Sequence, residues 1–267
     1  MPVRILRIIA GGMTTVFAAV VLACFPPASA AEIDDDVILG ALVAEFHISV
    51  AASLLSEAPT ADEPLSAEAI VGAAQLIVLT GIVEKPADAT EADLGKALDA
   101  FLVFAATLDK AKLPPIAPNL AKLLACQLIG LNPDARAALG AALKIDVAGA
   151  QACVADAAKA SAEWSGRLDP YRRGADHTPP EGAGPLYVEI APVIDESNEV
   201  IAESLRKSGL FEGLADRLNA KLALPYGRML LVTECGGPNA FFNPERRELV
   251  LCDERIAAWI AVQGKGP

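Results

Sequence analysis

The spacing of hydrophobic side chains changes once along this chain, and the change constrains the fold more than any other feature. From Asp36 to about Trp164, apolar residues recur every three or four positions, as one buried helix face requires. After the segment 171–185, which is rich in proline and glycine, the apolar runs become short and lie between turn signals, as in strands. We therefore predict an α+β fold, predominantly α-helical, with a small antiparallel sheet and further helices in the C-terminal part.

Turn and capping signals divide both parts into elements. In the first part, glycines, prolines and the pair Asn132-Pro133 mark the ends and starts of helices. Helices are predicted near 36–50, 66–81, 90–102, 120–130 and 149–164. In the second part, strands are predicted at 185–193, 228–234, 239–242 and 248–252, with helices over 195–222 and 255–262. The segment 171–185 between the parts is predicted to be a linker.

The first thirty residues have the pattern of an export signal. Arg4 and Arg7 precede an apolar core at 8–22, and the small residues 28–30 suit a signal peptidase. The apolar core is shorter than the roughly 20 residues that a membrane-spanning helix needs. We expect cleavage after Ala30, a periplasmic or secreted mature protein, and no stable membrane insertion after cleavage.

The charge of the chain limits its partners. It has 34 acidic against 22 basic side chains, a net charge of −12 at neutral pH, and removing the predicted signal makes it more acidic. Such a surface repels the phosphates of nucleic acids and anionic lipids. We expect a protein or peptide partner, which the sequence does not identify, and no nucleic acid.

Four cysteines follow the predicted signal: Cys126, Cys153, Cys235 and Cys252. An even number in an exported chain indicates disulfides, and four cysteines allow three pairings. Proximity in the sequence favours Cys126–Cys153 and Cys235–Cys252. Zinc binding by the same cysteines is the alternative, although no C-x-x-C spacing occurs.

Histidines are scarce, and common catalytic motifs are missing from the sequence. The chain has two histidines, His47 and His177, and contains no G-x-S-x-G, P-loop or G-x-G-x-x-G motif. His47 shares a helix face with Val43, Val50 and Leu54, which favours a hydrogen-bonded core residue. His177 lies in the linker, where a solvated side chain is expected.

The segment 222–256, LALPYGRMLLVTECGGPNAFFNPERRELVLCDERI, resembles part of a known family. It is similar to the start of the domain in exported bacterial zinc metallopeptidases, a domain family of unknown function. Those proteins have a strand, the motif E-C-G-x-x-N-A-[FWY]-[FY], a turn, an apolar strand, and then a cysteine with an acidic helix start. The matching residues here are Glu234, Cys235, Gly236, Asn239, Ala240, Phe241, Phe242 and Cys252.

The resemblance implies a zincin-like fold with a zinc helix, and this chain departs from that pattern. In the family the next helix carries H-E-x-x-H, whose histidines bind zinc while the glutamate activates water. The segment 46–55, FHISVAASLL, resembles that helix, but Ile48 stands at the glutamate position and Ala51 at the second histidine position. His47 is the one remaining candidate ligand. We therefore expect no catalytic residue, no metal site and no cofactor here, where the family has zinc.

The family segments occur in rotated order along this chain. Residues 31–170 resemble the C-terminal half of the metallopeptidase domain, and 186–267 resemble its N-terminal half. Either a circular permutation within one domain or two incomplete tandem copies would explain this order. The expected function is an inactive exported relative with a binding or scaffolding role. The alternative is a truncated form of an active secreted zinc metallopeptidase, whose H-E-x-x-H helix lies beyond residue 267.

Overall fold

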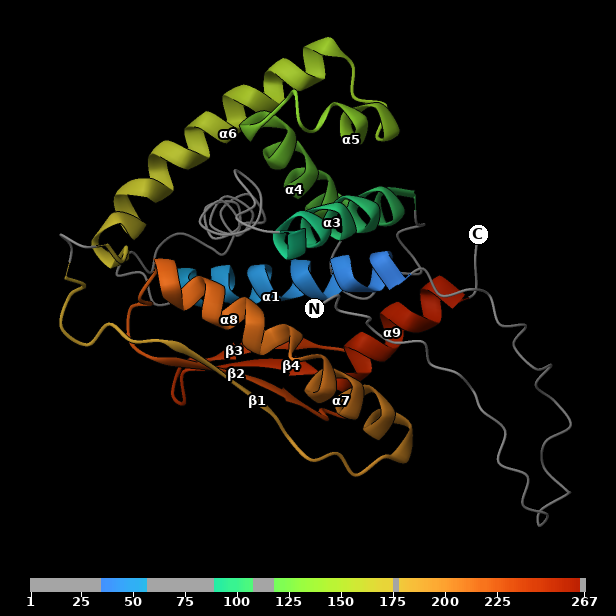
Figure 1. Ribbon diagram of the computed structural model, residues 1–267, viewed down its shortest axis with the longest axis vertical. Helices are drawn as coiled ribbons and strands as arrows, with labels where there is room; N and C mark the ends of the chain where they lie inside the picture. Colours follow the sequence, from blue (N-terminus) through green and yellow to red (C-terminus); the bar gives the residue numbers. More distant parts are fainter. Residues whose placement is uncertain (1–34, 57–88, 108–117, 175–177, 265–267) are drawn as a thin grey trace, which may run out of the picture.

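The computed structural model describes residues 35–56, 89–107, 118–174 and 178–264 (Figure 1). The predicted signal peptide, the predicted helix at 66–81 and His177 lie outside these residues. Within them, the first part is helical, as predicted. Its elements are α1 (Asp35–Ser56), α3 (Ala89–Thr107), α4 (Pro118–Leu131), α5 (Ala137–Ala142), α6 (Val147–Leu168) and the 3-10 helix η2 (Asp169–Tyr171).

The second part alternates strands and helices, which confirms the α+β, mostly helical fold. Its elements are β1 (Leu186–Ile190), α7 (Glu196–Ser208), α8 (Leu210–Lys221), β2 (Arg228–Thr233), β3 (Ala240–Asn243), β4 (Glu248–Cys252) and α9 (Asp253–Gly264). Gly209, with a φ of 61°, separates α7 from α8, because a left-handed residue interrupts a helix.

The sheet is mixed, so the prediction of an antiparallel sheet was wrong in this respect. The strand order is β1-β2-β4-β3, in which β1 and β4 run parallel to β2 and the edge strand β3 runs antiparallel to β4. The helices α7 and α8 carry the chain back to the starting end of the sheet, so β2 repeats the direction of β1. The β3–β4 hairpin then places β4, rather than β3, beside β2.

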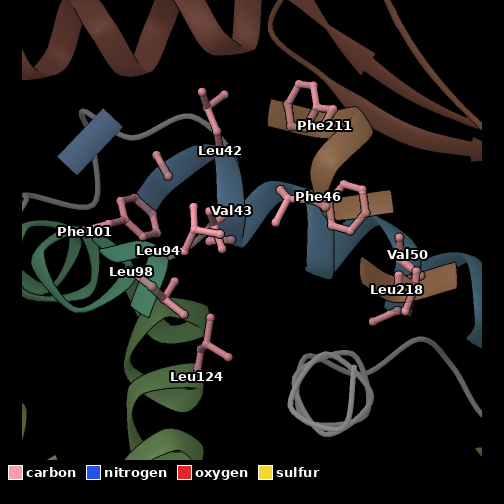
Figure 2. Packing of buried hydrophobic residues seen from close by; sticks show 14 of the residues in the cluster. Leu42, Val43, Phe46, Val50, Leu94, Leu98, Phe101, Leu124, Phe211 and Leu218 are labelled. Atoms are coloured by element: carbon pink, nitrogen blue, oxygen red, sulfur yellow. The ribbon is translucent and has the colours of Figure 1, made fainter. Parts of the chain in front are cut away.

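Helix α1 lies between α3 and the sheet, with α8 alongside (Figure 1). Figure 2 shows its apolar residues reaching both α3 and α8. Phe46 stacks against Phe211 of α8, with ring centroids 6.3 Å apart, and both rings are fully buried. On the sheet side, α1 contacts β3 and β4. Helical and α+β parts therefore share one hydrophobic core.

Two glycines allow close contact between helices. A Cβ atom on Gly40 of α1 would overlap the carbonyl oxygen of Ala97 in α3. A Cβ atom on Gly130 of α4 would likewise overlap the carbonyl oxygen of Cys153 in α6. The disulfide Cys126–Cys153 fastens this second contact, with Cα atoms 5.0 Å apart.

Buried polar groups connect α1 to α9. Glu45, 1% exposed, accepts hydrogen bonds from Arg255 Nε at 2.6 Å and from Trp259 Nε1 at 3.0 Å, both through Oε1. Arg255 is 5% exposed, so this is an ion pair within the core. It ties together residues 210 positions apart in the sequence.

One described helix, Asp36–Leu54, is long and apolar enough to cross a membrane, with a mean hydropathy of 1.9. In this structure 72% of that apolar window is buried. The core helix of a globular protein has the same length and composition, which fits the position of α1 between α3 and the sheet.

Candidate functional site

The family motif forms the hairpin of β3 and β4 and its connection to β2. Asn239 directly precedes β3: its Oδ1 accepts from the backbone N–H of Ala240 at 2.9 Å, and its carbonyl oxygen accepts from Cys252 N at 3.0 Å. At the tip, the Asn243 side chain accepts from the backbone N–H groups of the next turn, at 3.1 and 3.3 Å. Asparagine suits such turns because its side-chain oxygen replaces a backbone acceptor.

Phe241 and Phe242 point to opposite faces of β3, as strand geometry requires. Phe242 packs against the core, with the guanidinium carbon of Arg228 5.3 Å from its ring centroid. Phe241 is 47% exposed and pairs in register with Val250 of β4. Of the two aromatic rings, Phe241 is therefore the one available to a partner.

A disulfide closes the base of the hairpin. Cys235 and Cys252 are bonded, with Cα atoms 5.5 Å apart, which is the pairing that proximity favoured. Glu254 reinforces the closure: its carboxylate accepts from Cys235 N at 3.1 Å and from Gly236 N at 2.7 Å. Gly236 has a φ of 77°, a conformation that glycine adopts without strain.

Glu234 fastens the hairpin to the start of α7. Its carboxylate accepts from the backbone N–H groups of Ile194 and Asp195, both at 2.8 Å, and from Asn198 Nδ2 at 3.3 Å. These hydrogen bonds stabilise the ionised form, so they lower the pKa of Glu234. The glutamate of the motif therefore has a structural role, because it holds the backbone that leads into α7.

Asp253 is the chemically unusual residue at this site. It is fully buried at the first position of α9, and neither of its carboxylate oxygens has a hydrogen-bond partner among the described residues. Burial, followed by the nearby charges of Glu254 and Glu234, raises its pKa to about 6. At neutral pH it is a buried charge, which is costly without a partner.

His47 lies in the core on α1, 4% exposed, and is not part of the hairpin site. Its Nδ1 donates to the carbonyl oxygen of Val43 at 2.7 Å. His47 is therefore a hydrogen-bonded core residue, as its position on an apolar helix face predicts. Burial lowers its pKa to about 4. Ile48 and Ala51, one and four positions further on, offer no metal ligand.

The described residues do not fit the zinc site of a metallopeptidase. Within the described ranges, one group of side chains has donor atoms close enough to share an ion, namely Cys235, Cys252 and Glu254, within 4.8 Å of one another. The two sulfurs are bonded to each other, and a disulfide lacks the thiolates that bind zinc. His47 does not belong to this group, so the described residues do not form a set of three zinc ligands with an open position.

The sequence located the hairpin but missed the carboxylates behind it. Asp253 and Glu254 occupy the acidic helix start that follows the cysteine in the family pattern, and their position directly after Cys252 is the available signal. Glu199 lies on α7, which packs against α9, and no sequence spacing reveals that packing.

Together these features define a disulfide-clasped α+β protein whose family motif builds a closed hairpin beside a group of carboxylates. A family model described as "Putative metallopeptidase" matches residues 191–264. The match spans α7 to α9 and includes the hairpin, so this part of the chain is similar to that family. Comparison with curated proteins finds no match, and comparison with solved structures finds none either.

Proposed function

We propose that this chain is an exported, non-catalytic relative of the zinc metallopeptidases, with a binding or scaffolding role toward a protein or peptide. The observation that carries the proposal is the composition of α1 around His47. Ile48 and Ala51 stand where the family has its glutamate and second histidine. Hydrolysis at zinc needs several protein ligands and a base, and these two side chains supply neither.

Export is part of the proposal. The pattern of the first thirty residues supports it, and so do the two disulfides, because disulfides persist in oxidising compartments and are rare in the reducing cytosol.

We further propose that the two parts of the chain are the halves of one metallopeptidase domain in rotated order. Residues 31–170 would correspond to its C-terminal half, 171–185 to the linker, and 186–267 to its N-terminal half. The packing of α1 on β3, β4 and α9 supports this arrangement, because a permuted domain brings these elements into one core. The match of the family model to 191–264 is consistent with it.

A peptidase assay tests the absence of catalysis. The disulfide-bonded chain is incubated with zinc and a mixed-sequence fluorogenic peptide library, beside the variant His47→Gln. We expect no cleavage above buffer for either protein. Zinc-dependent cleavage that His47→Gln abolishes would overturn the proposal. An H-E-x-x-H motif encoded in frame after codon 267 would instead support a truncated active enzyme.

A further inference from the structure

Strand β1 forms the edge of the sheet that lies opposite the hairpin (Figure 1). Its backbone pairs with β2 on one side: the carbonyl oxygen of Pro185 accepts from β2 at 3.0 Å, and the N–H of Ala191 donates to β2 at 2.9 Å. Backbone groups alternate in direction along a strand, so the residues between these two alternate as well. Leu186, Val188 and Ile190 therefore direct their N–H and C=O groups to the side away from β2.

This outer side of β1 is occupied at its start and open further along. Gly184 exchanges two backbone hydrogen bonds with the segment before β2, at 2.9 and 2.8 Å. The amide of Asn219 on α8 then takes both backbone groups of Leu186, each at 2.8 Å. Within the described part of the chain, Val188 and Ile190 have no such partner. Four backbone groups at the end of β1 are thus available for one more strand.

The solvent face of β1 gives this open edge a charge. Tyr187 is 62% exposed, and Glu189 is exposed and forms no ion pair among the residues that the structure describes. An antiparallel strand bonded to Val188 and Ile190 would place its central residue directly opposite Glu189, in the closer type of cross-strand pair. Opposite charges in such a pair are stabilising, whereas like charges are destabilising. The edge therefore favours lysine or arginine at that position.

The same charge disfavours a second copy of this chain as the added strand. Pairing of β1 with its own copy through the open groups would place Glu189 opposite Glu189 of that copy. The other two-fold register, centred on Val188, would need the backbone groups of Leu186, which Asn219 already holds. The net charge of −12 adds to the repulsion between copies.

We propose that β1 binds an extended, basic segment of another protein as an additional antiparallel strand, with lysine or arginine opposite Glu189. The proposal rests on the binding role proposed above and gives it a surface and a class of partner. Backbone hydrogen bonds to Val188 and Ile190 supply affinity, and the side chains of the solvent face supply selectivity. Tyr187 lies two positions from Glu189 on that face, within diagonal reach of a long basic side chain.

A blocked peptide, acetyl-TVKVT-amide, tests the site on the intact, disulfide-bonded chain. Its lysine would lie opposite Glu189, and its two valines would bond Val188 and Ile190. With the peptide at about ten times its Kd, amide hydrogen exchange at Val188 and Ile190 should slow roughly tenfold, as measured by NMR. The amides of Tyr187 and Glu189 already face β2, so their exchange should change little.

Charge reversal tests the pairing with Glu189. Acetyl-TVEVT-amide should bind the native chain about three- to tenfold more weakly than the lysine peptide. Glu189→Lys should reverse that preference. Glu245→Lys is the matched control, because Glu245 is exposed at the tip of the hairpin on the opposite edge of the sheet. This variant should keep the native preference for lysine.

N-methylation of the peptide tests the backbone pairing. Methyl groups on the two valine nitrogens remove the donors that face β1 and should abolish binding. A methyl group on the lysine nitrogen, which faces away from β1, should leave most of the affinity. Equal binding of the two methylated peptides would overturn strand addition at this edge.

Three further results would overturn the proposal. The first is that the native chain fails to bind the lysine peptide at millimolar concentration, and the second is that it binds the lysine and glutamate peptides equally. The third is protection of Val188 and Ile190 without peptide that grows with protein concentration, which would assign the edge to a second copy. Protection at β3 instead would move the binding site and keep the binding role. Cleavage of the peptide would contradict the absence of catalysis, not the site on β1.

Discussion

The imidazole of His47 lies among the apolar side chains of α1, with the ring of Phe46 edge-on at 5.2 Å and the Val43 carbonyl oxygen 2.7 Å from Nδ1. A carbonyl oxygen only accepts, so Nδ1 carries the proton of the neutral ring. Charging this ring would place a cation in the core, which explains the fall of its pKa to about 4.

This burial predicts a specific acid sensitivity. In the unfolded chain His47 titrates near 6.5, so acid favours unfolding as the pH drops below that value. The stabilisation is complete above pH 6.5 and is lost as the pH falls toward 4. Between pH 7 and pH 5 the contribution of His47 should fall by about 2 kcal/mol. Urea denaturation at both pH values measures it, by comparison of the native chain with His47→Gln.

Other buried acids also titrate in this range, so the informative quantity is the difference between the two proteins. His47→Gln keeps a donor near Val43 but has no titrating ring. An equal loss of stability in both proteins on going from pH 7 to pH 5 would show that the ring of His47 is protonated in the folded state.

At this scale the sequence predicted core placement for His47 and the pairing of Cys235 with Cys252. It did not predict that Glu234 binds the backbone just before α7 or that Glu254 accepts a hydrogen bond from Cys235 N. Both interactions depend on how loops approach from elsewhere in the fold, and spacing along one strand or helix carries no information about such approaches.

At the scale of elements, helices and strands begin and end close to where periodicity and turn residues place them. Strand directions were harder to predict. The sheet was predicted to be antiparallel, whereas β1 and β4 both run parallel to β2, and β4 lies between β2 and β3. The hydrophobic pattern of a strand shows which face is buried but not which strand lies beside it.

The contact between α1 and α3 supports a second prediction. Gly40→Ala would push a methyl group into the Ala97 carbonyl oxygen, so the helices must separate. We expect this variant to lose about 1–3 kcal/mol of unfolding free energy. Gly213→Ala in α8 is the control: no atom lies within 4 Å of its added Cβ, and a stabilisation of up to about 1 kcal/mol is expected. Both values come from chemical denaturation.

The essential result is which of the two variants has the lower free energy of unfolding. If Gly40→Ala proved as stable as Gly213→Ala, α1 and α3 would not be in the close contact described here.

At the scale of the whole molecule, the buried pair of Glu45 and Arg255 joins the first described helix to the last. The two residues lie in different sequence regions, and neither stands out from its local pattern. Long-range pairs of this kind cannot be read from a single sequence, because they follow from the packing of complete elements.

Breaking this pair should destabilise the entire fold. Glu45→Gln leaves the guanidinium of Arg255 buried without its counter-charge, and we expect a loss of about 3–5 kcal/mol. The exposed pair of Glu203 and Lys207 provides the control, for which Glu203→Gln should leave the free energy of unfolding nearly unchanged. Tryptophan fluorescence, including that of Trp259, and helical circular dichroism should change in one shared transition.

Separate transitions for the two signals would indicate that the helical part and the α+β part unfold independently. That outcome would favour two tandem bodies over the single rotated domain.

Our proposal for this chain, of which residues 191–264 are similar to a metallopeptidase family, includes that it does not bind zinc through His47. Equilibrium dialysis of the disulfide-bonded chain against micromolar zinc, followed by elemental analysis, measures the zinc content per chain. We expect far less than one zinc ion per chain, with the same content for the native protein and for His47→Gln. One zinc ion per native chain, lost in His47→Gln, would contradict it.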